Sequence, residues 1–327
     1  MTPRPYKLSA SKKMGSLLVD AFFSGLSWLG QRHPHAKPAH HKLEVLRNIP
    51  YMADGRREHL LDVYRPLQRL PNNPAILYIH GGAFRILSKD THWLMGLAFA
   101  KRGYTVFSIN YRLAPQQPYP AAVEDCCAAY NWLVAHAAEY GADPQRIAIA
   151  GESAGGNLAV AVALTASFAR PEPWAAAVFA HGIRPVAALP ACGMLQVSDP
   201  HRLRRRKPKI ANFVNDRLLE VTHAYLHNTD HLDAEAMQLA DPLLILESDV
   251  QPVHPLPPMF APVGTADPLL DDTRRLAKAL EKRGVVCDVH YYPGELHAFH
   301  ALVFRKNARL CWQDTYRFLE RYVPITA

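Results

Sequence analysis

Short apolar runs and helical stretches alternate along the chain from about residue 42 onward. The apolar runs lack regular polar alternation, which is typical of strands that are buried on both faces of a sheet. Between them, apolar residues recur at three- and four-residue steps, as in helices that pack one face on a sheet. The pattern predicts an α/β fold, with a mostly parallel sheet covered by helices on each side. The predicted strands span 43–49, 60–64, 75–79, 105–109, 147–150, 175–180, 259–263 and 285–291, and the clearest helices span 121–139, 156–168, 271–283 and 301–322.

The interval between the predicted strands at 175–180 and 259–263 is too long for a single crossover. About eighty residues lie there, where one helix and its loops would need about twenty. We therefore predict an inserted helical cap over 181–257. We expect the basic run 202–209 at its entrance to be a solvated, flexible loop, because blocks of like charge seldom order themselves. One helical face inside the insertion is formed by Ile210, Phe213, Val214, Leu218, Val221 and Tyr225.

The segment 1–41 has an apolar helical face of its own, running from Met14 to Leu29. Asp20 interrupts it and no small-residue cleavage site follows, which disfavours a signal peptide. The run is also shorter than the ~20 residues that a membrane-spanning helix needs. We interpret the segment as an amphipathic helix that covers part of this protein, with contact to a membrane surface as the alternative. For the histidines that follow, a solvated hinge is favoured over a metal site; they are His33, His35, His40 and His41.

Composition narrows the class of protein. The chain of 327 residues is 49% hydrophobic and 20% charged, so it can bury a full core. Its net charge of +8 is concentrated in two stretches, 1–43 and 201–209, and the remainder is mildly acidic. This distribution disfavours nucleic-acid binding, where the fold itself carries the basic surface. The five cysteines are odd in number and form no CxxC pair, so we expect a reducing compartment, the cytoplasm, and no zinc site.

A candidate nucleophile lies where a predicted strand meets a predicted helix. Gly151-Glu152-Ser153-Ala154-Gly155 is the only GxSxG motif in the chain, and it directly follows the strand at 147–150. A serine hydroxyl projects from such a sharp turn only if small residues flank it. The helix that follows directs its free amides toward the site and favours negative charge there. The sequence therefore predicts Ser153 as the nucleophile, and the alternative is a purely structural turn.

A second glycine-containing segment follows the strand at 75–79. In His80-Gly81-Gly82-Ala83-Phe84 the glycines let backbone amides approach a substrate closely. Acyl transfer places negative charge on the former carbonyl oxygen, which preorganised amides stabilise. We assign the oxyanion hole to the amides of Gly81, Gly82 and Ala154. We expect the ring of His80 to hold the loop by hydrogen bonds rather than to act as the base.

Taken together, these motifs resemble those of the hormone-sensitive-lipase-like esterases, also called bacterial family IV carboxylesterases. The resemblance rests on His80-Gly81-Gly82, on Asn110-Tyr111-Arg112-Leu113-Ala114-Pro115 with Tyr119–Ala122 and Asp125, and on 151–157. It implies an α/β-hydrolase fold, whose mostly parallel eight-stranded sheet would be formed by 42–180 and 258–327. It also implies a cap built from the N-terminal segment and from an insertion after the sixth strand, and no cofactor or metal. Tyr111, Arg112 and Asp125 would stabilise the catalytic loops.

Two positions depart from the family pattern. Ala83 stands where many members have a third glycine, and Glu152 replaces the more usual aspartate beside the nucleophile. The first substitution leaves the predicted donors in place. The second bears on neighbouring hydrogen bonds or on substrate preference.

The acid and the base are expected after the nucleophile in the chain, as in this fold. Asp267 follows the strand at 259–263, at the point where the chain leaves the sheet before Pro268. Its competitors Asp271 and Asp272 lie in the first turn of the next helix, where acidic residues complement the helix dipole anyway. Beyond the last strand, His297-Ala298-Phe299 matches the family pattern of histidine, small residue and phenylalanine. The sequence predicts Asp267 and His297 as the triad partners of Ser153, with His300 as the alternative base.

These residues predict hydrolysis of a small carboxylic ester through an acyl-enzyme intermediate. We expect Phe84, Leu87 and Glu152 to contact the substrate, and we expect short- to medium-chain or aryl esters. Amide or lactone hydrolysis is one alternative, and a catalytically silent binding protein on the same scaffold is another. The family resemblance also makes a homodimer, paired through an edge strand, a hypothesis.

Overall fold

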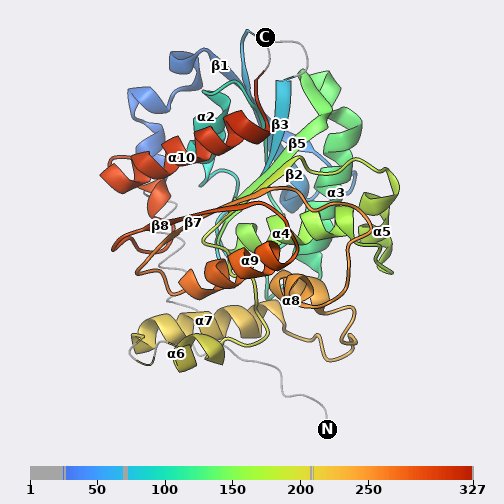
Figure 1. Cartoon of the computed structure of the whole chain (residues 1–327). Coiled ribbons are helices and arrows are strands. Elements are labelled where there is room, and N and C mark those ends of the chain that lie inside the picture. The colour runs from blue at the N-terminus through green and yellow to red at the C-terminus, as the bar shows by residue number, and fades with distance from the viewer. Residues whose placement is uncertain (1–24, 26, 69–72, 207, 209, 326–327) are drawn as a thin grey trace.

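The computed structural model describes residues 25, 27–68, 73–206, 208 and 210–325, and its frame is one eight-stranded sheet (Figure 1). The strand order is β1-β2-β4-β3-β5-β6-β7-β8, in which β1, β2 and β4 pair antiparallel and the other neighbours pair parallel. The strands are β1 Leu43–Pro50, β2 Leu60–Pro66, β3 Asn73–Ile79, β4 Thr105–Ile109, β5 Ala142–Glu152, β6 Ala187–Ala191, β7 Met259–Gly264 and β8 Cys287–Tyr292. The predicted fold is confirmed.

Helices cover both faces of the sheet, because the central strands are apolar on both sides. One buried cluster joins the sheet to α3 (Ala121–His136), α4 (Ala154–Ser167), α5 (Pro173–Ala180), α8 (Pro242–Glu247) and α9 (Leu270–Lys282). A second cluster joins the opposite face to α2 (Trp93–Ala100) and α10 (Lys306–Tyr322). Adjacent residues of one strand belong to different clusters, as Ile76 and Leu77 of β3 do.

One predicted strand is wrong. Residues 175–180 lie in helix α5, and the sixth strand is β6, which falls inside the segment predicted as insertion. Pro173 occupies the first turn of α5, where its missing amide hydrogen costs nothing, and the alanines after it favour a helix. Ala175 and Val178 are its buried residues, three apart, which is a helical spacing. The connection between the sixth and seventh strands therefore begins after Ala191, and the cap predicted for this segment stays a prediction.

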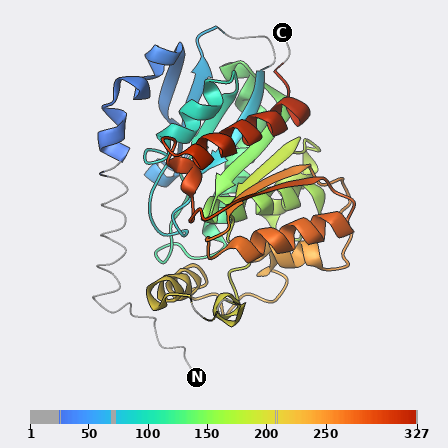
Figure 2. The same cartoon turned by 60° about the vertical axis from the view of Figure 1, so that its left-hand side comes forward.

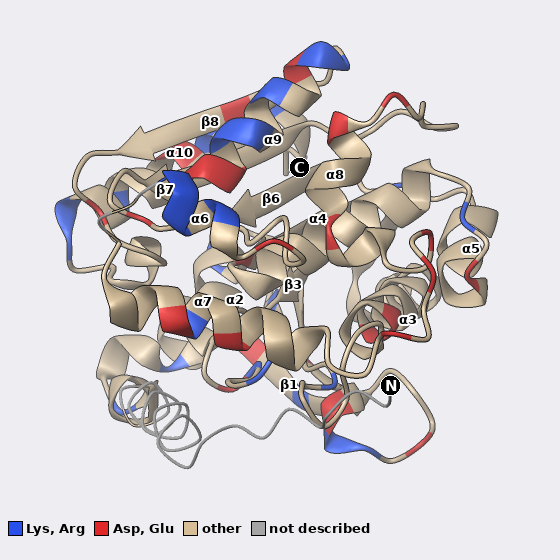
Figure 3. Ribbon diagram, turned by 90° about the horizontal axis from the view of Figure 1, so that it is seen from below, with Lys and Arg blue, Asp and Glu red and all other residues tan. Residues whose placement is uncertain are grey.

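The segment between β6 and β7 contains α6 (His201–Arg206) and α7 (Asn212–Tyr225) as well as α8, and α6 and α7 lie together at one end of the molecule (Figures 1 and 2). The basic run is not the flexible loop that we expected, since most of it is α6. Arg202 is buried, and its Nη2 lies 2.6 Å from both carboxylate oxygens of Asp272 at the start of α9. Figure 3 shows the basic ribbon of α6 beside the acidic first turn of α9. This ion pair orders the run by neutralising part of its charge.

Most of the predicted N-terminal helix lies outside the described residues. Of its apolar positions, Gly25, Trp28 and Leu29 are described, and they are helical. Trp28 and Leu29 are exposed, while Gln31 Nε2 donates to the carbonyl of Asp90 at 3.1 Å. In the part of the chain that is described, no helix has the length and the hydropathy that crossing a bilayer requires.

Candidate active site

Ser153 occupies a strained turn between β5 and α4. Its φ of 55° and ψ of −116° are unusual for a residue with a side chain, and such a conformation costs of the order of 1–3 kcal/mol. Two glycines make the turn sterically accessible. A Cβ on Gly151 would lie 2.4 Å from the carbonyl oxygen of Gly155, and one on Gly155 would lie 2.1 Å from that of Ile79. The Ser153 side chain is therefore presented at the carboxyl edge of the sheet, in front of the amides of α4.

Asp267 and His297 meet at the same edge. Asp267 follows β7, is buried, and accepts a hydrogen bond of 2.8 Å from the Leu269 amide on Oδ1. His297 lies in the loop after β8, and its Nδ1 donates to Asp267 Oδ2 at 2.8 Å. This bond leaves Nε2 as the proton-accepting nitrogen of a neutral ring. No recorded hydrogen bond joins Ser153 to His297 among the described residues; in unliganded enzymes such bonds are often long and tighten only with substrate.

The competing residues are engaged elsewhere. Asp272 is buried, pairs with Arg202 and accepts a hydrogen bond from the Leu195 amide at 2.9 Å, and Asp271 pairs with Arg206. His300 is buried, and burial lowers the pKa of its imidazole. These partners account for each competitor without a catalytic role.

The His297 imidazole has a raised pKa. Partial burial favours its neutral form, but the neighbouring Cys192 and the Asp267 carboxylate, which both interact with the ring, outweigh that effect, so its pKa lies well above the ordinary histidine value of 6.5. Cys192 was not among the predicted site residues. It follows β6 directly, so a sequence analysis that had placed the sixth strand at 187–191 could have found it.

The segment after β3 approaches the nucleophile as expected, but one of its amides is already used. Gly81 N donates to Glu152 Oε1 at 2.8 Å. Gly82 has a φ of 117°, and a Cβ there would lie 2.0 Å from the Ile86 carbonyl oxygen, so only glycine fits. The amides of Gly82 and Ala83 lie outside helices and strands, and no recorded bond within the described chain uses them. These two amides, rather than that of Gly81, are available to a ligand.

The ring of His80 holds this loop, in agreement with the prediction. Its Nδ1 donates to the Gly81 carbonyl at 2.6 Å, and the ring stacks on Tyr111 with a centroid distance of 4.3 Å. Burial lowers the pKa of His80 to about 3, so it is neutral at physiological pH. Tyr111 donates from its hydroxyl to the His80 carbonyl at 2.9 Å. Arg112 Nη2 lies 2.7 Å from Asp125 Oδ1, which gives both residues the structural role that the resemblance implied.

Glu152 is buried behind the nucleophile rather than exposed to a substrate cleft. Besides the Gly81 amide, its carboxylate accepts hydrogen bonds from the Tyr78 hydroxyl and, at 2.7 Å, from His92 Nε2. Burial raises the pKa of Glu152, but the charge of His92 and the hydrogen bonds outweigh it and lower the pKa overall. The same contact raises the pKa of His92 despite its burial. The pair is thus charged, and it holds the Gly81 loop to the strand that carries Ser153.

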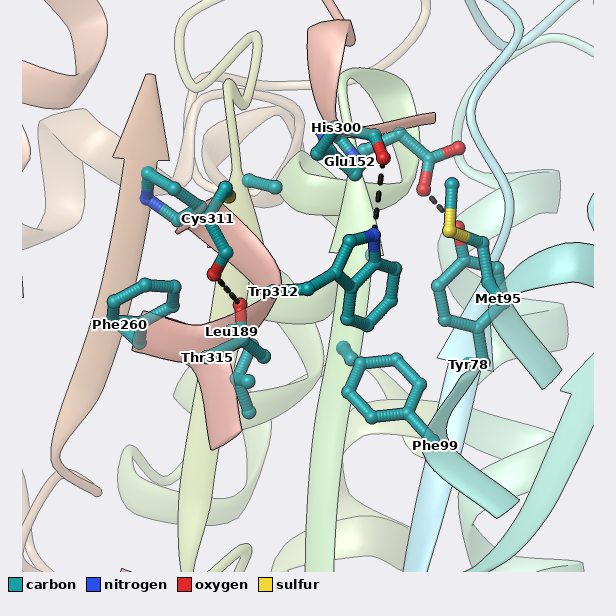
Figure 4. A pocket seen from close by; sticks show the side chains of 14 residues that line it. Tyr78, Met95, Phe99, Glu152, Leu189, Phe260, His300, Cys311, Trp312 and Thr315 are labelled. Carbon is teal, nitrogen blue, oxygen red and sulfur yellow. Dashed lines mark hydrogen bonds between the residues drawn. The ribbon is translucent and has the colours of Figure 1, made fainter. Parts of the chain in front are cut away.

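A cavity of about 30 Å³ lies beside this ion pair, between the sheet and helices α2 and α10 (Figure 4). Tyr78 and His300 line it together with apolar side chains, among them Phe99 and Trp312. Trp312 Nε1 donates to the His300 carbonyl at 3.0 Å across it. The cavity lies on the face of the sheet opposite α4, so we do not assign the substrate to it.

Phe84 and Leu87 lie in the loop after β3, and Phe84 contacts helix α7. Phe84 is fully buried and stacks on Tyr225 of α7, with ring centroids 3.8 Å apart. The Tyr119 amide donates to the Tyr225 carbonyl at 2.8 Å, which fixes the end of α7 to the core. Leu87 is half-buried and has a φ of 72°.

Comparison with known proteins agrees with the fold. A family model described as alpha/beta hydrolase fold matches residues 76–301. The chain is 33% identical to an acetyl esterase of Salmonella schwarzengrund over 70% of this chain and 66% of that protein. It is 33% identical to the carboxylesterase NlhH of Mycobacterium tuberculosis over 77% and 74% of the two chains. Among solved structures, a bacterial heroin esterase has the same fold, with a TM-score of 0.77 at 22% identity over 95% of this chain and 92% of that one. An esterase of the bacterial hormone-sensitive lipase family is similar with a TM-score of 0.67 and 26% identity, over 86% and 85% of the chains.

Proposed function

The chain belongs to the α/β-hydrolase fold family, among its hormone-sensitive-lipase-like bacterial esterases, and from this premise we propose that it hydrolyses carboxylic esters through Ser153, His297 and Asp267. The observation that carries the proposal is the Asp267–His297 hydrogen bond at the sheet edge from which Ser153 projects. Burial of Asp267 in this position supports its role as the group that orients the imidazole.

In the proposed reaction, His297 Nε2 accepts the Ser153 proton as Oγ attacks the ester carbonyl carbon. The imidazolium that forms is stabilised by the Asp267 carboxylate, and it then protonates the departing alkoxide. Water, activated by the same nitrogen, hydrolyses the acyl-serine. Every proton transfer uses a group of this chain.

The oxyanion hole is proposed to consist of the amides of Gly82, Ala83 and Ala154. Ala154 is the first residue of α4, where an amide has no acceptor within the helix. We leave Gly81 out of the hole because its amide donates to Glu152. Glu152 is instead proposed as the residue that positions the loop. One such donor typically contributes about 3 kcal/mol to stabilising the transition state.

The substrate class is proposed to be esters of short to medium acyl chains. The relative named acetyl esterase supports a small acyl group, and the relative named carboxylesterase supports a carboxylic ester. The closed aromatic stack of Phe84 on Tyr225 supports a pocket bounded by the cap helix α7. The alternative of a catalytically silent binding protein predicts no turnover.

The test is a pair of measurements on the wild type and on Ser153→Ala. The wild type should hydrolyse p-nitrophenyl acetate and butyrate faster than the palmitate, and its Ser153 should be labelled covalently by a fluorophosphonate probe. The variant should lose at least ~10³-fold in kcat, with an unchanged circular dichroism spectrum, because the nucleophile is absent. Undiminished turnover in Ser153→Ala would refute the assignment, and a wild type that does not react with the probe would favour the silent scaffold.

A further inference from the structure

A buried thiol lies next to the proposed catalytic pair. Cys192 is 1% exposed and directly follows β6, the strand between β5, which carries Ser153, and β7, which leads to Asp267. Its amide donates to the Pro262 carbonyl at 3.0 Å, and its φ is 40°. The strand order and this bond together fix the thiol at the carboxyl edge of the sheet, where Asp267 and His297 meet.

The three side chains offer ligand atoms at metal-binding separations. Cys192 Sγ, an Asp267 oxygen and a His297 ring nitrogen all lie within 4.8 Å of one another, and the Asp267–His297 pair is at 2.8 Å. A tetrahedral Zn²⁺ with the usual bond lengths would hold such atoms about 3.4–3.6 Å apart. The Asp267–His297 pair would have to lengthen from 2.8 Å, and no other pair of these atoms is further apart than 4.8 Å, so small side-chain rotations are enough to form three bonds.

We propose that Cys192, Asp267 and His297 form an inhibitory binding site for a borderline-soft divalent cation, represented by Zn²⁺. Thiolate, imidazole and carboxylate together suit Zn²⁺, whereas Mg²⁺ and Ca²⁺ prefer oxygen ligands alone. The side chain of His297 is 34% exposed while Cys192 and Asp267 are buried, so the ion enters from the histidine side. The fourth position stays open to water.

The inhibition follows from the chemistry of the ring and rests on the proposed function. Coordination through Nδ1 breaks the hydrogen bond to Asp267 and requires the other neutral tautomer, so the single ring proton moves by way of solvent from Nδ1 to Nε2. Coordination through Nε2 occupies the lone pair that would accept the Ser153 proton. In both cases the base is lost, and the thiol proton passes to solvent as the thiolate binds the ion.

The first experiment measures hydrolysis of p-nitrophenyl acetate by the full-length chain against the concentration of ZnCl₂. We expect reversible inhibition by Zn²⁺, recovery on addition of EDTA, and no effect of Mg²⁺ at the same concentrations. In Cys192→Ser, with each rate taken relative to that variant's own metal-free rate, the concentration for half inhibition should rise at least ~10-fold because one ligand is lost. Cys287→Ser is the matched control, since Cys287 is more exposed than Cys192 but lies at the start of β8, away from the proposed triad. This variant should be inhibited by Zn²⁺ at the same concentrations as the wild type. Equal sensitivity of the Cys192→Ser variant and the wild type would overturn the proposal.

The second experiment does not depend on esterase activity. Co²⁺ bound to a thiolate gives a charge-transfer absorption in the near ultraviolet, which should appear with the wild type and with Cys287→Ser but not with Cys192→Ser or Cys192→Ala. Thermal unfolding of each variant verifies that it is folded. If the wild type shows the Co²⁺ absorption but hydrolyses no ester, the metal site stands and the proposed function fails. If it hydrolyses esters but shows no absorption, the metal site fails alone.

Discussion

At the scale of residues, three neighbouring carboxylates illustrate how position selects a role. Asp267, Asp271 and Asp272 are nearly adjacent in sequence, yet their partners are His297, Arg206 and Arg202. Only the first faces an imidazole. The other two join α9 to the cap helix α6, one at the surface and one in the interior.

Asp267→Asn should therefore reduce kcat/KM for p-nitrophenyl acetate by about 10⁴-fold, because an amide no longer orients or stabilises the imidazolium. Asp271→Asn removes a half-exposed surface partner of Arg206 and should change kcat/KM less than about threefold. Steady-state kinetics of the two variants under the same conditions tests this difference. A larger loss in Asp271→Asn than in Asp267→Asn would contradict the triad.

The pH dependence of catalysis should follow the raised pKa of His297. The base acts only when neutral, so kcat/KM rises with pH, and a pKa well above 6.5 moves this rise toward neutral and alkaline pH. We expect kcat/KM at pH 6 to be at least ~10-fold below its plateau. In Asp267→Asn the midpoint should move to lower pH, because the carboxylate charge that helps to raise the pKa of His297 is gone. A wild-type midpoint below 6.5 would be inconsistent with this environment.

The residues that could be predicted from the sequence are those whose role is encoded locally. Ser153 and the glycines beside it depend on one strand–turn–helix junction, and the conformation found there agrees with the prediction. Cys192, and the bond from Gly81 to Glu152, depend on strand neighbours that are far apart in sequence. Cys192 could have been placed at this edge only if β6 had been recognised as a strand, and spacing along the chain contains no signal for the bond from Gly81 to Glu152.

At the scale of elements, amphipathic or continuous apolar patterns predicted most strands and helices well. The exception is the sixth strand, which was predicted at 175–180 and lies at 187–191, and the composition of the two segments explains the error. The β6 sequence Ala-Ala-Leu-Pro-Ala lacks β-branched residues and includes a proline, whereas the apolar run of α5 is longer and rich in alanine. The strand propensities of the residues therefore favoured neither segment as a strand. Pairing with β5 and β7 makes β6 a strand, and tertiary contact of this kind is not visible in a single sequence.

One buried ion pair, Arg202–Asp272, attaches α6 to α9. Arg202→Ala should lower the free energy of unfolding by about 3–5 kcal/mol, because the substitution leaves Asp272 buried without its partner. Arg205→Ala is the matched control from the same helix. Arg205 pairs with Asp199 at the surface, and its loss should cost less than about 1 kcal/mol. Urea unfolding of both variants measures the difference. Equal losses would mean that the Arg202–Asp272 pair contributes no more than a surface contact.

At the scale of the whole molecule, the uneven distribution of charge allows a test of the alternative interpretation of 1–41, in which this segment contacts a membrane surface. The exposed Trp28 and Leu29 belong to the basic stretch 1–43, and such a combination is typical of segments that bind the surface of anionic bilayers. We expect the chain to sediment with phosphatidylserine vesicles at low salt and to be released at high salt. The homodimer through an edge strand likewise stays a prediction.

A double substitution of Trp28→Ser and Leu29→Ser should reduce vesicle partitioning at least ~10-fold, because two apolar side chains no longer enter the lipid. Phe213→Ser is the matched control, as Phe213 is equally exposed but lies on α7. Phosphatidylcholine vesicles provide the neutral comparison. If the double variant still binds the vesicles, Trp28 and Leu29 do not bind the membrane. The favoured interpretation, in which 1–41 covers part of this protein, would then remain.

The double attachment of Tyr225 constrains how reactants come and go. Its ring lies against Phe84 and its carbonyl is bonded to the Tyr119 amide, so α7 cannot hinge outward without unstacking two aromatic rings and stranding a backbone donor. A reactant of the proposed site would then have to pass a stationary helix, and we expect it to enter on the side where His297 is exposed. The size of the leaving group, and not the speed of an opening motion, should then set the order of turnover rates.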